Sequence, residues 1–318
     1  MRRRSKAITE ALQAKIANLP TGPGVYQFYD RHGGLLYVGK SLNLRRRVRS
    51  YFAPSQNWEK AQGMLPLITD LQALPCDTHL EARLLECEQI KTLRPPFNSQ
   101  MKGDRRYIYL DLPADRLPQV ISRRTDTSVG PFRSQWNLRR FLTSLRLLYP
   151  LEERADGLRL TYHPLPLRLS AASQSSTSAL LRRCLTEEAM ADALLTAAEQ
   201  QMLVEAEEMR FERAAFFKDL LPTLRRLKHN AGTYRDFLAG TYHVALPLAK
   251  GTRHFYIRDG LVADSAFAGA DETFNLDLFL FMAAAQPRAL PDEKAALDFR
   301  DIVFTELQNF PAEQVTRL

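Results

Sequence analysis

The chain has 318 residues and a formal net charge of +8, from 44 Lys+Arg against 36 Asp+Glu. This length allows two or three compact units, and the basic residues cluster in the first 125 positions. The cluster suggests an acidic partner such as nucleic acid, although ordinary solubilising charge explains the total equally well. No apolar run approaches the length of a membrane span, and the basic N-terminus is not followed by the apolar segment of a signal peptide.

The cysteines are few and widely spaced. Cys76, Cys87 and Cys184 never occur in C-x-x-C spacing, so the sequence supports neither a disulfide framework nor a zinc site. A reducing cytoplasm is therefore the expected compartment, with no association with a membrane.

The first hundred residues alternate between helix and strand patterns. Residues 7–19 carry apolar side chains four apart, which predicts an amphipathic helix. A Gly-Gly turn separates the strand in PGVYQF from the strand LLYVG and predicts a hairpin. A helix capped by Ser41 or Asn43 follows and runs to about Phe52. The capping box of Thr78 and Glu81 then opens a second helix, which ends at RPPFN.

The rest of the chain is predicted with less detail. RRYIYLDL and PQVISRR are typical of strands, and NLRRFLTSLRLLYPL is typical of a helix. Residues 169–179 are rich in Ser and Ala and have the composition of a linker or mobile loop. Helix is expected from about 186 to 228, followed by strands in YHVALPLA and HFYIRDG and then by helices. The apolar segment LDLFLFMAAA is expected to be a core helix.

Two charged residues interrupt otherwise apolar helix faces. Arg47 lies on the stripe formed by Leu44, Val48 and Tyr51, so it points toward the sheet while the neighbouring arginines do not. Glu86 lies on a stripe with Ala82, Ile90 and Leu93. Buried charges need a partner, so the pattern predicts either an Arg47–Glu86 ion pair that joins two helices or a functional site.

Three residues of the hairpin carry reactive groups. The hairpin can bring Tyr26 and Tyr37 close together, and Lys40 follows the second strand directly. Tyrosines on neighbouring strands usually serve only in packing, so taken singly none of these residues points to chemistry.

Taken together, these residues resemble a known signature. Gly24-Val25-Tyr26 and Tyr37-Val38-Gly39 are similar to the two triplets of GIY-YIG nucleases. LPTGPGVY, LLECEQIKTLRPPFN and MKGDRRYIYL resemble the N-terminal half of the excinuclease subunit UvrC and the related Cho nucleases, in order over residues 19–150. The resemblance implies a DNA endonuclease that makes one incision, on the 3′ side of a lesion, in nucleotide excision repair.

The resemblance also implies roles for single residues. The catalytic positions of the family fall on Tyr26, Tyr37, Lys40, Arg47, Tyr51, Glu86 and Asn98. Glu86 is then the ligand for one Mg²⁺ or Mn²⁺ ion, which keeps most of its waters. Tyr37 is the favoured general base, with Tyr26 holding the network, although the reverse order stays open. Asn98 is expected to close the site by hydrogen bonds.

Double-stranded DNA is the expected substrate. Backbone contacts are predicted for the basic residues that flank the expected site, namely Arg45, Arg46, Arg49, Lys102, Arg105 and Arg106.

Residues 202–227 resemble the UVR motif, the helical hairpin through which UvrB and UvrC associate. Its expected contacts with a UvrB-like protein are Phe211, Glu212, Arg213, Phe216 and Phe217, the last two if they are exposed. The hairpin is expected to break near Met209, with Phe211 and Ala215 facing inward. A plain hairpin packed on its own domain is the alternative, and Pro222 departs from the motif.

UvrC-like proteins often carry four cysteines that bind an iron–sulfur cluster ahead of the UVR motif. The corresponding region of this chain keeps at most Cys184, so no cluster is expected. The sequence thus predicts an α/β (α+β) protein with four parts. Residues 1–108 form a GIY-YIG nuclease domain with a small mixed sheet flanked by helices. Residues 109–185 form a connecting region, 186–230 a UVR-like hairpin, and 231–318 a small α+β segment without an assigned role. A GIY-YIG nuclease acting outside excision repair and a non-catalytic DNA-binding adaptor remain alternatives.

Overall fold

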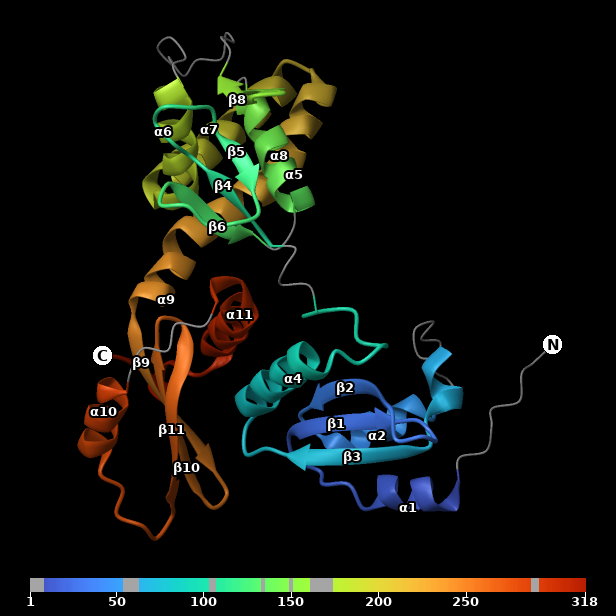
Figure 1. Ribbon diagram of the computed structural model, residues 1–318. Coiled ribbons are helices and arrows are strands. Elements are labelled where there is room, and N and C mark those ends of the chain that lie inside the picture. The colour runs from blue at the N-terminus through green and yellow to red at the C-terminus, as the bar shows by residue number, and fades with distance from the viewer. Residues whose placement is uncertain are drawn as a thin grey trace, which may run out of the picture. The chain divides into compact units, whose positions relative to one another are not determined.

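The computed structural model describes residues 9–53, 63–102, 107–132, 135–148, 151–160, 174–286 and 292–318. Its contacts divide the chain into two compact units, one from Met1–Gly103 with Gly240–Leu318 and one from Asp104–Ala239. Both units combine helices with small antiparallel sheets, which confirms the expected α/β class (Figure 1). Among the described residues, no helix has the length and apolar composition needed to cross a bilayer.

The N-terminal part of unit 1 is built on a three-stranded sheet of order β2-β1-β3. Its elements are α1 (Glu10–Ala17), β1 (Gly24–Tyr29), β2 (Leu35–Ser41), α2 (Leu44–Tyr51), η1 (Leu65–Leu67), β3 (Asp70–Pro75) and α4 (His79–Leu93). The predicted hairpin is β1–β2, and β3 pairs with the other edge of β1, so the sheet is antiparallel throughout rather than mixed. β3 was not predicted, because Leu71 is its one fully buried side chain and the segment lacks a strand pattern.

The helix starts follow the expected capping chemistry. Asn43 accepts a hydrogen bond from the backbone N–H of Arg46 and caps α2. Thr78 and Glu81 form the predicted capping box of α4, with both reciprocal hydrogen bonds present. These caps fix where the two helices begin, and so which side chains of α2 and α4 face the sheet.

The C-terminal part of unit 1 is a second antiparallel sheet of order β11-β10-β9-β12 with two helices. Its elements are β9 (Thr241–Leu248), β10 (Gly251–Arg258), β11 (Leu261–Gly269), α10 (Leu276–Ala285), α11 (Glu293–Asn309), η4 (Ala312–Gln314) and β12 (Val315–Arg317). The expectation that LDLFLFMAAA is a core helix is wrong. It forms α10, but only Ala283 is buried there, and Phe281 is 71% exposed.

Helix α4 packs on two partners, with β1 and β2 on one side and α11 on another (Figure 1). Ala82, Glu86 and Ile90 are buried, as their common stripe predicts. Leu93, the last member of that predicted stripe, is 51% exposed because it stands in the final turn, where the helix ends at Arg94 in a left-handed conformation.

Unit 2 combines a three-stranded sheet of order β5-β4-β6, a β7–β8 hairpin and helices around one apolar core. Its elements are β4 (Ile108–Asp111), β5 (Gln119–Ile121), β6 (Ser128–Phe132), α5 (Gln135–Leu148), β7 (Leu151–Arg154), β8 (Gly157–Leu160), α6 (Gln174–Thr186), α7 (Glu188–Glu207), α8 (Phe211–His229), η3 (Asn230–Tyr234) and α9 (Arg235–Ala239). The expected linker is wrong from Gln174 onward, because this stretch begins α6 and its Thr177 and Ser178 are buried. Residues 169–173 lie outside the described part of the chain.

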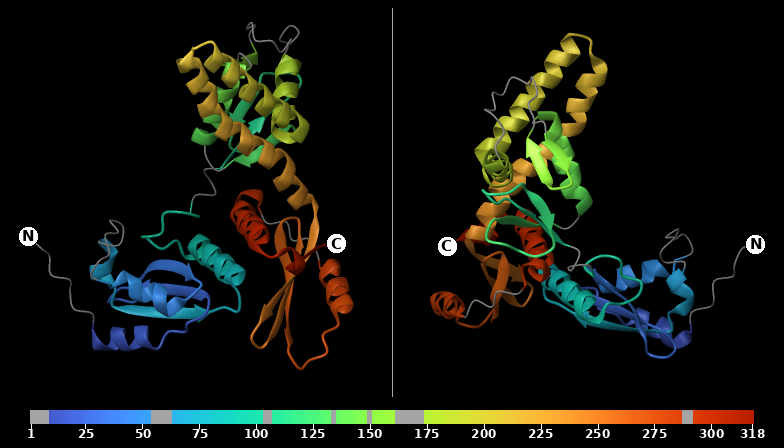
Figure 2. Two further views of the ribbon diagram at one scale, coloured as in Figure 1. Left: turned by 180° about the vertical axis from the view of Figure 1, so that it is seen from behind. Right: turned by 45° about the horizontal axis from the view of Figure 1, so that its top comes forward.

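The helical hairpin of unit 2 consists of α7 and α8 side by side (Figure 2). It breaks at the predicted position, where Met209 has a φ of 57°. The expectation that Phe211 and Ala215 face inward is wrong. Ala214, Phe217 and Leu221 form the buried face instead, so the phase of the helix differs by one residue from the predicted one. α8 continues through Pro222, which lies inside it.

Candidate active site

Three tyrosines gather where the β1–β2 hairpin meets α2. The ring centroids of Tyr26 and Tyr37 are 6.1 Å apart, and the ring of Tyr51 lies 5.8 Å from the first and 6.3 Å from the second. The hydroxyls of Tyr26 and Tyr51 form a hydrogen bond of 2.8 Å. The hairpin therefore brings the two predicted strand tyrosines together, and α2 adds a third.

Gly39 makes this close approach possible. A Cβ atom at this position would lie 2.4 Å from the hydroxyl oxygen of Tyr26 and 2.7 Å from the ring of Tyr37. No side chain fits in that space, so the last residue of the second triplet must be glycine for the tyrosines to keep their places.

Glu86 reaches the end of β2 from α4. Its Oε1 accepts a hydrogen bond of 3.0 Å from the backbone N–H of Lys40. The other oxygen accepts no hydrogen bond from the residues that the structure describes. Burial raises the pKa of this carboxyl, while the Lys40 N–H acts in the opposite direction. A half-satisfied, buried carboxylate of this kind is suited to bind a cation.

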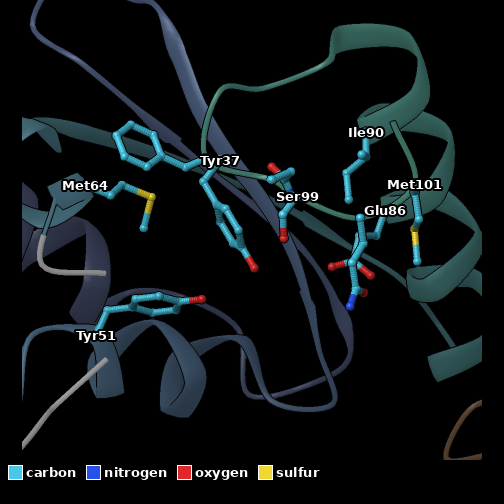
Figure 3. A pocket seen from close by; sticks show the side chains of 10 residues that line it. Tyr37, Tyr51, Met64, Glu86, Ile90, Ser99 and Met101 are labelled. Atoms are coloured by element: carbon cyan, nitrogen blue, oxygen red, sulfur yellow. The ribbon is translucent and has the colours of Figure 1, made fainter. Parts of the chain in front are cut away.

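A pocket of about 220 Å³ opens between these groups. Tyr37 and Tyr51 point into it from one side and Glu86 from the opposite side (Figure 3). Tyr26 does not line the pocket and is 1% exposed. Of the remaining lining residues, the sequence pointed only to Asn98 and, as part of the stripe of Glu86, to Ile90. The full set is Met64, Ile90, Phe97, Asn98, Ser99, Gln100 and Met101.

Two cationic side chains flank the tyrosines and the carboxylate. The guanidinium carbon of Arg47 lies 5.3 Å from the ring centroid of Tyr51, and its charge acts to lower the pKa of Tyr37. Lys40 places its Nζ 3.2 Å from Nε2 of His79, and burial lowers the pKa of its ammonium. The described residues thus do not show the alternative Arg47–Glu86 ion pair, because Arg47 contacts tyrosines and Glu86 bonds to Lys40.

Burial raises the pKa of the phenols. The pKa of Tyr37 lies well above its usual value, mainly through loss of solvent and then through the neighbouring Tyr51. The pKa of Tyr26 is also raised well above that value, by deeper burial. Both tyrosines are therefore neutral at physiological pH unless further positive charge enters the pocket.

Asn98 holds β2 from outside the sheet. Its Oδ1 accepts a hydrogen bond of 3.0 Å from the backbone N–H of Val38, and its Nδ2 donates one of 2.8 Å to the carbonyl of the same residue. The backbone N–H of Phe97 donates to the carbonyl of Leu36. The backbone on both sides of Tyr37 is thereby fixed, so Asn98 both lines the pocket and positions that tyrosine.

The basic residues expected at DNA differ in their surroundings. Arg46 and Arg49 are exposed, whereas Nε of Arg45 donates a hydrogen bond of 2.7 Å to the carbonyl of Leu19. Lys102 donates to the carbonyl of Pro95. Arg105 and Arg106 lie outside the described residues.

The expected partner contacts on the helical hairpin separate into two groups. The exposed group consists of Phe211, Glu212, Arg213 and Phe216. The exposed fraction of Phe211 is 63%. Phe217 is 7% exposed and packs in the core of unit 2, so it does not meet the condition of exposure on which its role depended.

Comparisons with known proteins identify related sequences. A family model described as UvrC-like GIY-YIG domain matches residues 22–99. The UvrABC system protein C of Caldicellulosiruptor saccharolyticus is 37% identical over 145 residues, which are 44% of this chain and 24% of that protein. The one of Desulfitobacterium hafniense is 27% identical over 318 residues, covering 96% of this chain and 50% of that protein.

One solved structure is also similar in sequence to part of the chain. It is the GIY-YIG N-terminal endonuclease domain of UvrC from Thermotoga maritima, bound to magnesium, and it is 34% identical in sequence. The match covers 29% of this chain and 99% of that domain, with a TM-score of 0.26. The match of the family model identifies residues 22–99 as a GIY-YIG domain. The domain is of the UvrC-like kind, and the chain spans half or less of the length of these two UvrABC system C proteins.

Proposed function

We propose that the protein is a metal-dependent DNA endonuclease that hydrolyses a phosphodiester bond. The observation that carries the proposal is the pocket of about 220 Å³ in which Tyr37 and Glu86 face each other, with Lys40 and Arg47 beside them. A general base, a carboxylate for a cation and positive charge for the phosphoryl oxygens are the groups that this reaction needs.

The residues fit one hard divalent cation, Mg²⁺ or Mn²⁺. Glu86 has one oxygen without a hydrogen bond from the described residues, and those residues include no group of three or more His, Cys, Asp or Glu that could hold a metal ion. A single carboxylate with several retained waters is a common arrangement for Mg²⁺ at phosphate sites. The ion, when bound, neutralises charge at the scissile phosphate. The absence of an iron–sulfur cluster stays a prediction.

We assign the role of general base to Tyr37. Its hydroxyl faces the pocket, whereas Tyr26 is buried behind it and bonds to Tyr51. The charge of Arg47 favours the ionised form of Tyr37, whereas burial opposes ionisation. Ionisation therefore needs the additional positive charge of the bound cation. Lys40 and Arg47 then stabilise the charge that develops on the phosphate.

We propose that the reaction is the incision on the 3′ side of a lesion in nucleotide excision repair, in the cytoplasm. The similarity to UvrC supports this setting, and double-stranded DNA is its substrate. Exposed Arg46 and Arg49 on α2 are suited to contact its backbone. The exposed Phe211 and Phe216 on α8 are suited to contact a UvrB-like protein.

Nicking of supercoiled or lesion-containing DNA tests the chemistry. The full chain should nick with Mg²⁺ or Mn²⁺, and Glu86→Ala should reduce the rate at least about 100-fold while DNA binding persists. Glu88→Ala is the matched control, because Glu88 is an exposed carboxylate on the same helix. Equal nicking by Glu86→Ala and wild type would refute the assignment.

Addition of a UvrB protein tests the biological setting. Nicking that requires UvrB and is lost in a Phe211→Ser and Phe216→Ser double variant would support the excision-repair role. Nicking that ignores UvrB would favour a GIY-YIG nuclease acting on other DNA structures. DNA binding without nicking under all of these conditions would favour the interpretation as a non-catalytic DNA-binding adaptor.

A further inference from the structure

The C-terminal part of unit 1 docks on the GIY-YIG domain through charged residues. On α4, His79, Arg83 and Lys91 recur at multiples of four and so share one face of the helix. On α11, Asp298 and Glu306 share a face with the buried Ile302 between them. Helices α4 and α11 pack against each other (Figure 1). Cations of α4 meet carboxylates of α11 in this contact.

The contact between α4 and α11 has an ion pair at each end. Lys91 meets Asp298 at 2.7 Å, and Arg83 meets Glu306 at the same distance. Both carboxylates are almost completely buried, which requires that their charge is compensated. These pairs alone would only fasten the two helices together.

The Glu306 end differs because it continues into the active site. Oε1 of Glu306 lies 3.0 Å from Nδ1 of His79, and Nε2 of the same ring lies 3.2 Å from Nζ of Lys40. A carboxylate accepts only, so Nδ1 carries the proton. In the neutral ring Nε2 is then an acceptor, and the Lys40 ammonium donates to it.

Lys40 is consequently held at both ends. Its backbone N–H bonds to Glu86, and its ammonium bonds to His79. The first bond orients the carboxylate that faces the pocket, and the second fixes the direction of a cation beside the proposed phosphate position. Glu306 determines which nitrogen of His79 can accept a hydrogen bond from the Lys40 ammonium. The orientation of the Lys40 side chain therefore depends on a residue more than 200 positions away in the sequence.

We propose that Glu306 is a positioning residue for catalysis, acting on Lys40 through His79, and that one role of residues 240–318 is to supply it. This inference rests on the proposed nuclease function. Fixed orientation of a charged group before the reaction avoids reorganisation during it, and loss of such supporting residues commonly costs 10- to 100-fold in activity.

The Lys91–Asp298 pair provides an internal control. It joins the same two helices with the same kind of contact, but within the described part of the chain neither of its members bonds to Lys40 or to His79. If Glu306 only fastens α11 to α4, then Glu306→Gln and Asp298→Asn should act alike. If Glu306 positions Lys40, only Glu306→Gln should impair nicking.

The first experiment measures single-turnover nicking and DNA binding of the full chain. Glu306→Gln should lower the nicking rate about tenfold or more with unchanged DNA affinity, and His79→Phe should have a similar effect. The double variant should be no slower than the slower single variant, because both changes break one chain of contacts. Glu306→Asp should not restore the wild-type nicking rate, since the shorter aspartate side chain does not reach the ring of His79.

The second experiment needs no nuclease activity. Acetylation of Lys40 by acetic anhydride, followed by mass spectrometry of the full chain, should become several-fold faster in Glu306→Gln and stay at the wild-type rate in Asp298→Asn. Equal labelling rates in all three proteins, or equal nicking by Glu306→Gln and wild type, would overturn the inference. If the wild-type protein does not nick DNA, only the proposed nuclease function is refuted. The labelling rate still shows whether Glu306 controls the environment of the Lys40 ammonium.

Discussion

Unit 1 contains two sheets that place titratable rings in the same way, with different results. In the first sheet Tyr26 pairs with Gly39 and Phe28 pairs with Tyr37, so the two tyrosines are diagonal neighbours on adjacent antiparallel strands. Tyr37 of this pair lines a pocket that Glu86 enters from α4.

In the second sheet His243 and His254 are diagonal neighbours on β9 and β10. Nε2 of the first and Nδ1 of the second are 2.9 Å apart, and the second ring stacks on Phe274 at 4.3 Å. The ring nitrogens that face each other are thus occupied, and the stacked Phe274 covers a face of the pair.

The difference shows that a cross-strand pair of titratable rings does not make a site by itself. The tyrosines differ from the histidines in having a pocket, an opposed carboxylate and cations nearby. The histidines satisfy each other within the sheet, so the second pair is expected to contribute to stability and the first to chemistry.

The largest expected effect comes from removing the Tyr37 hydroxyl. Tyr37→Phe should reduce single-turnover nicking by about 10²- to 10⁴-fold, because the base is lost while the ring still packs. His254→Phe is the matched change in the other sheet and should leave nicking unaltered. Equal losses in both variants would contradict the assignment of chemistry to the tyrosine pair alone.

The pH dependence of nicking sharpens the same distinction. In the proposed reaction Tyr37 acts in its ionised form, and burial raises its pKa above the ordinary value of 10.0. Below that pKa the ionised fraction grows about tenfold per pH unit, so the rate should rise with pH until it levels at the pKa of the loaded site. A rate that stays flat or falls from about pH 6.5 to 9 would contradict the role of Tyr37.

Gly39 tests the close packing of the tyrosines. Gly39→Ala should lower the free energy of unfolding by about 1–3 kcal/mol, because the new methyl group overlaps the hydroxyl of Tyr26 and the ring of Tyr37. Gly22→Ala is the matched control, since a Cβ there meets no atom within 4 Å. Chemical denaturation measures both, and a variant at Gly39 as stable as that at Gly22 would disprove the predicted overlap.

The smallest expected effect concerns the histidine pair. Burial lowers the pKa of both His243 and His254 below the usual value of 6.5. As pH falls below about 6.5, the unfolded chain takes up protons that the folded pair resists, so the free energy of unfolding declines until the pH passes the folded pKa values. A His243→Gln and His254→Phe double variant should lose less stability than wild type over this range, measured by denaturation at each pH.

The sequence predicted the site where local rules determine it. The β1–β2 hairpin, the caps of α2 and α4, and the inward stripes of Arg47 and Glu86 all follow from residues close together in the chain. Knowledge of the GIY-YIG signature was still needed, because each of these residues alone has an ordinary structural explanation.

Other features escaped prediction because they depend on distant segments. Nothing near His79 in the sequence indicates that Glu306 will lie beside it. The phase of α8 and the exposure of α10 depend on which neighbours cover each helix, so apolar composition alone misplaced Phe211 and Phe281. The third strand carries too little buried surface to show a pattern.

The hydrogen bonds of Asn98 also affect how the protein meets other chains. β2 is an edge strand, and an edge with free N–H and C=O groups is a template on which a foreign strand can add. At Val38 both groups are taken by one side-chain amide, and at Leu36 the carbonyl is taken by Phe97. The residue that positions Tyr37 thus also occupies this edge, so we expect substitutions at position 98 to lower solubility as well as nicking.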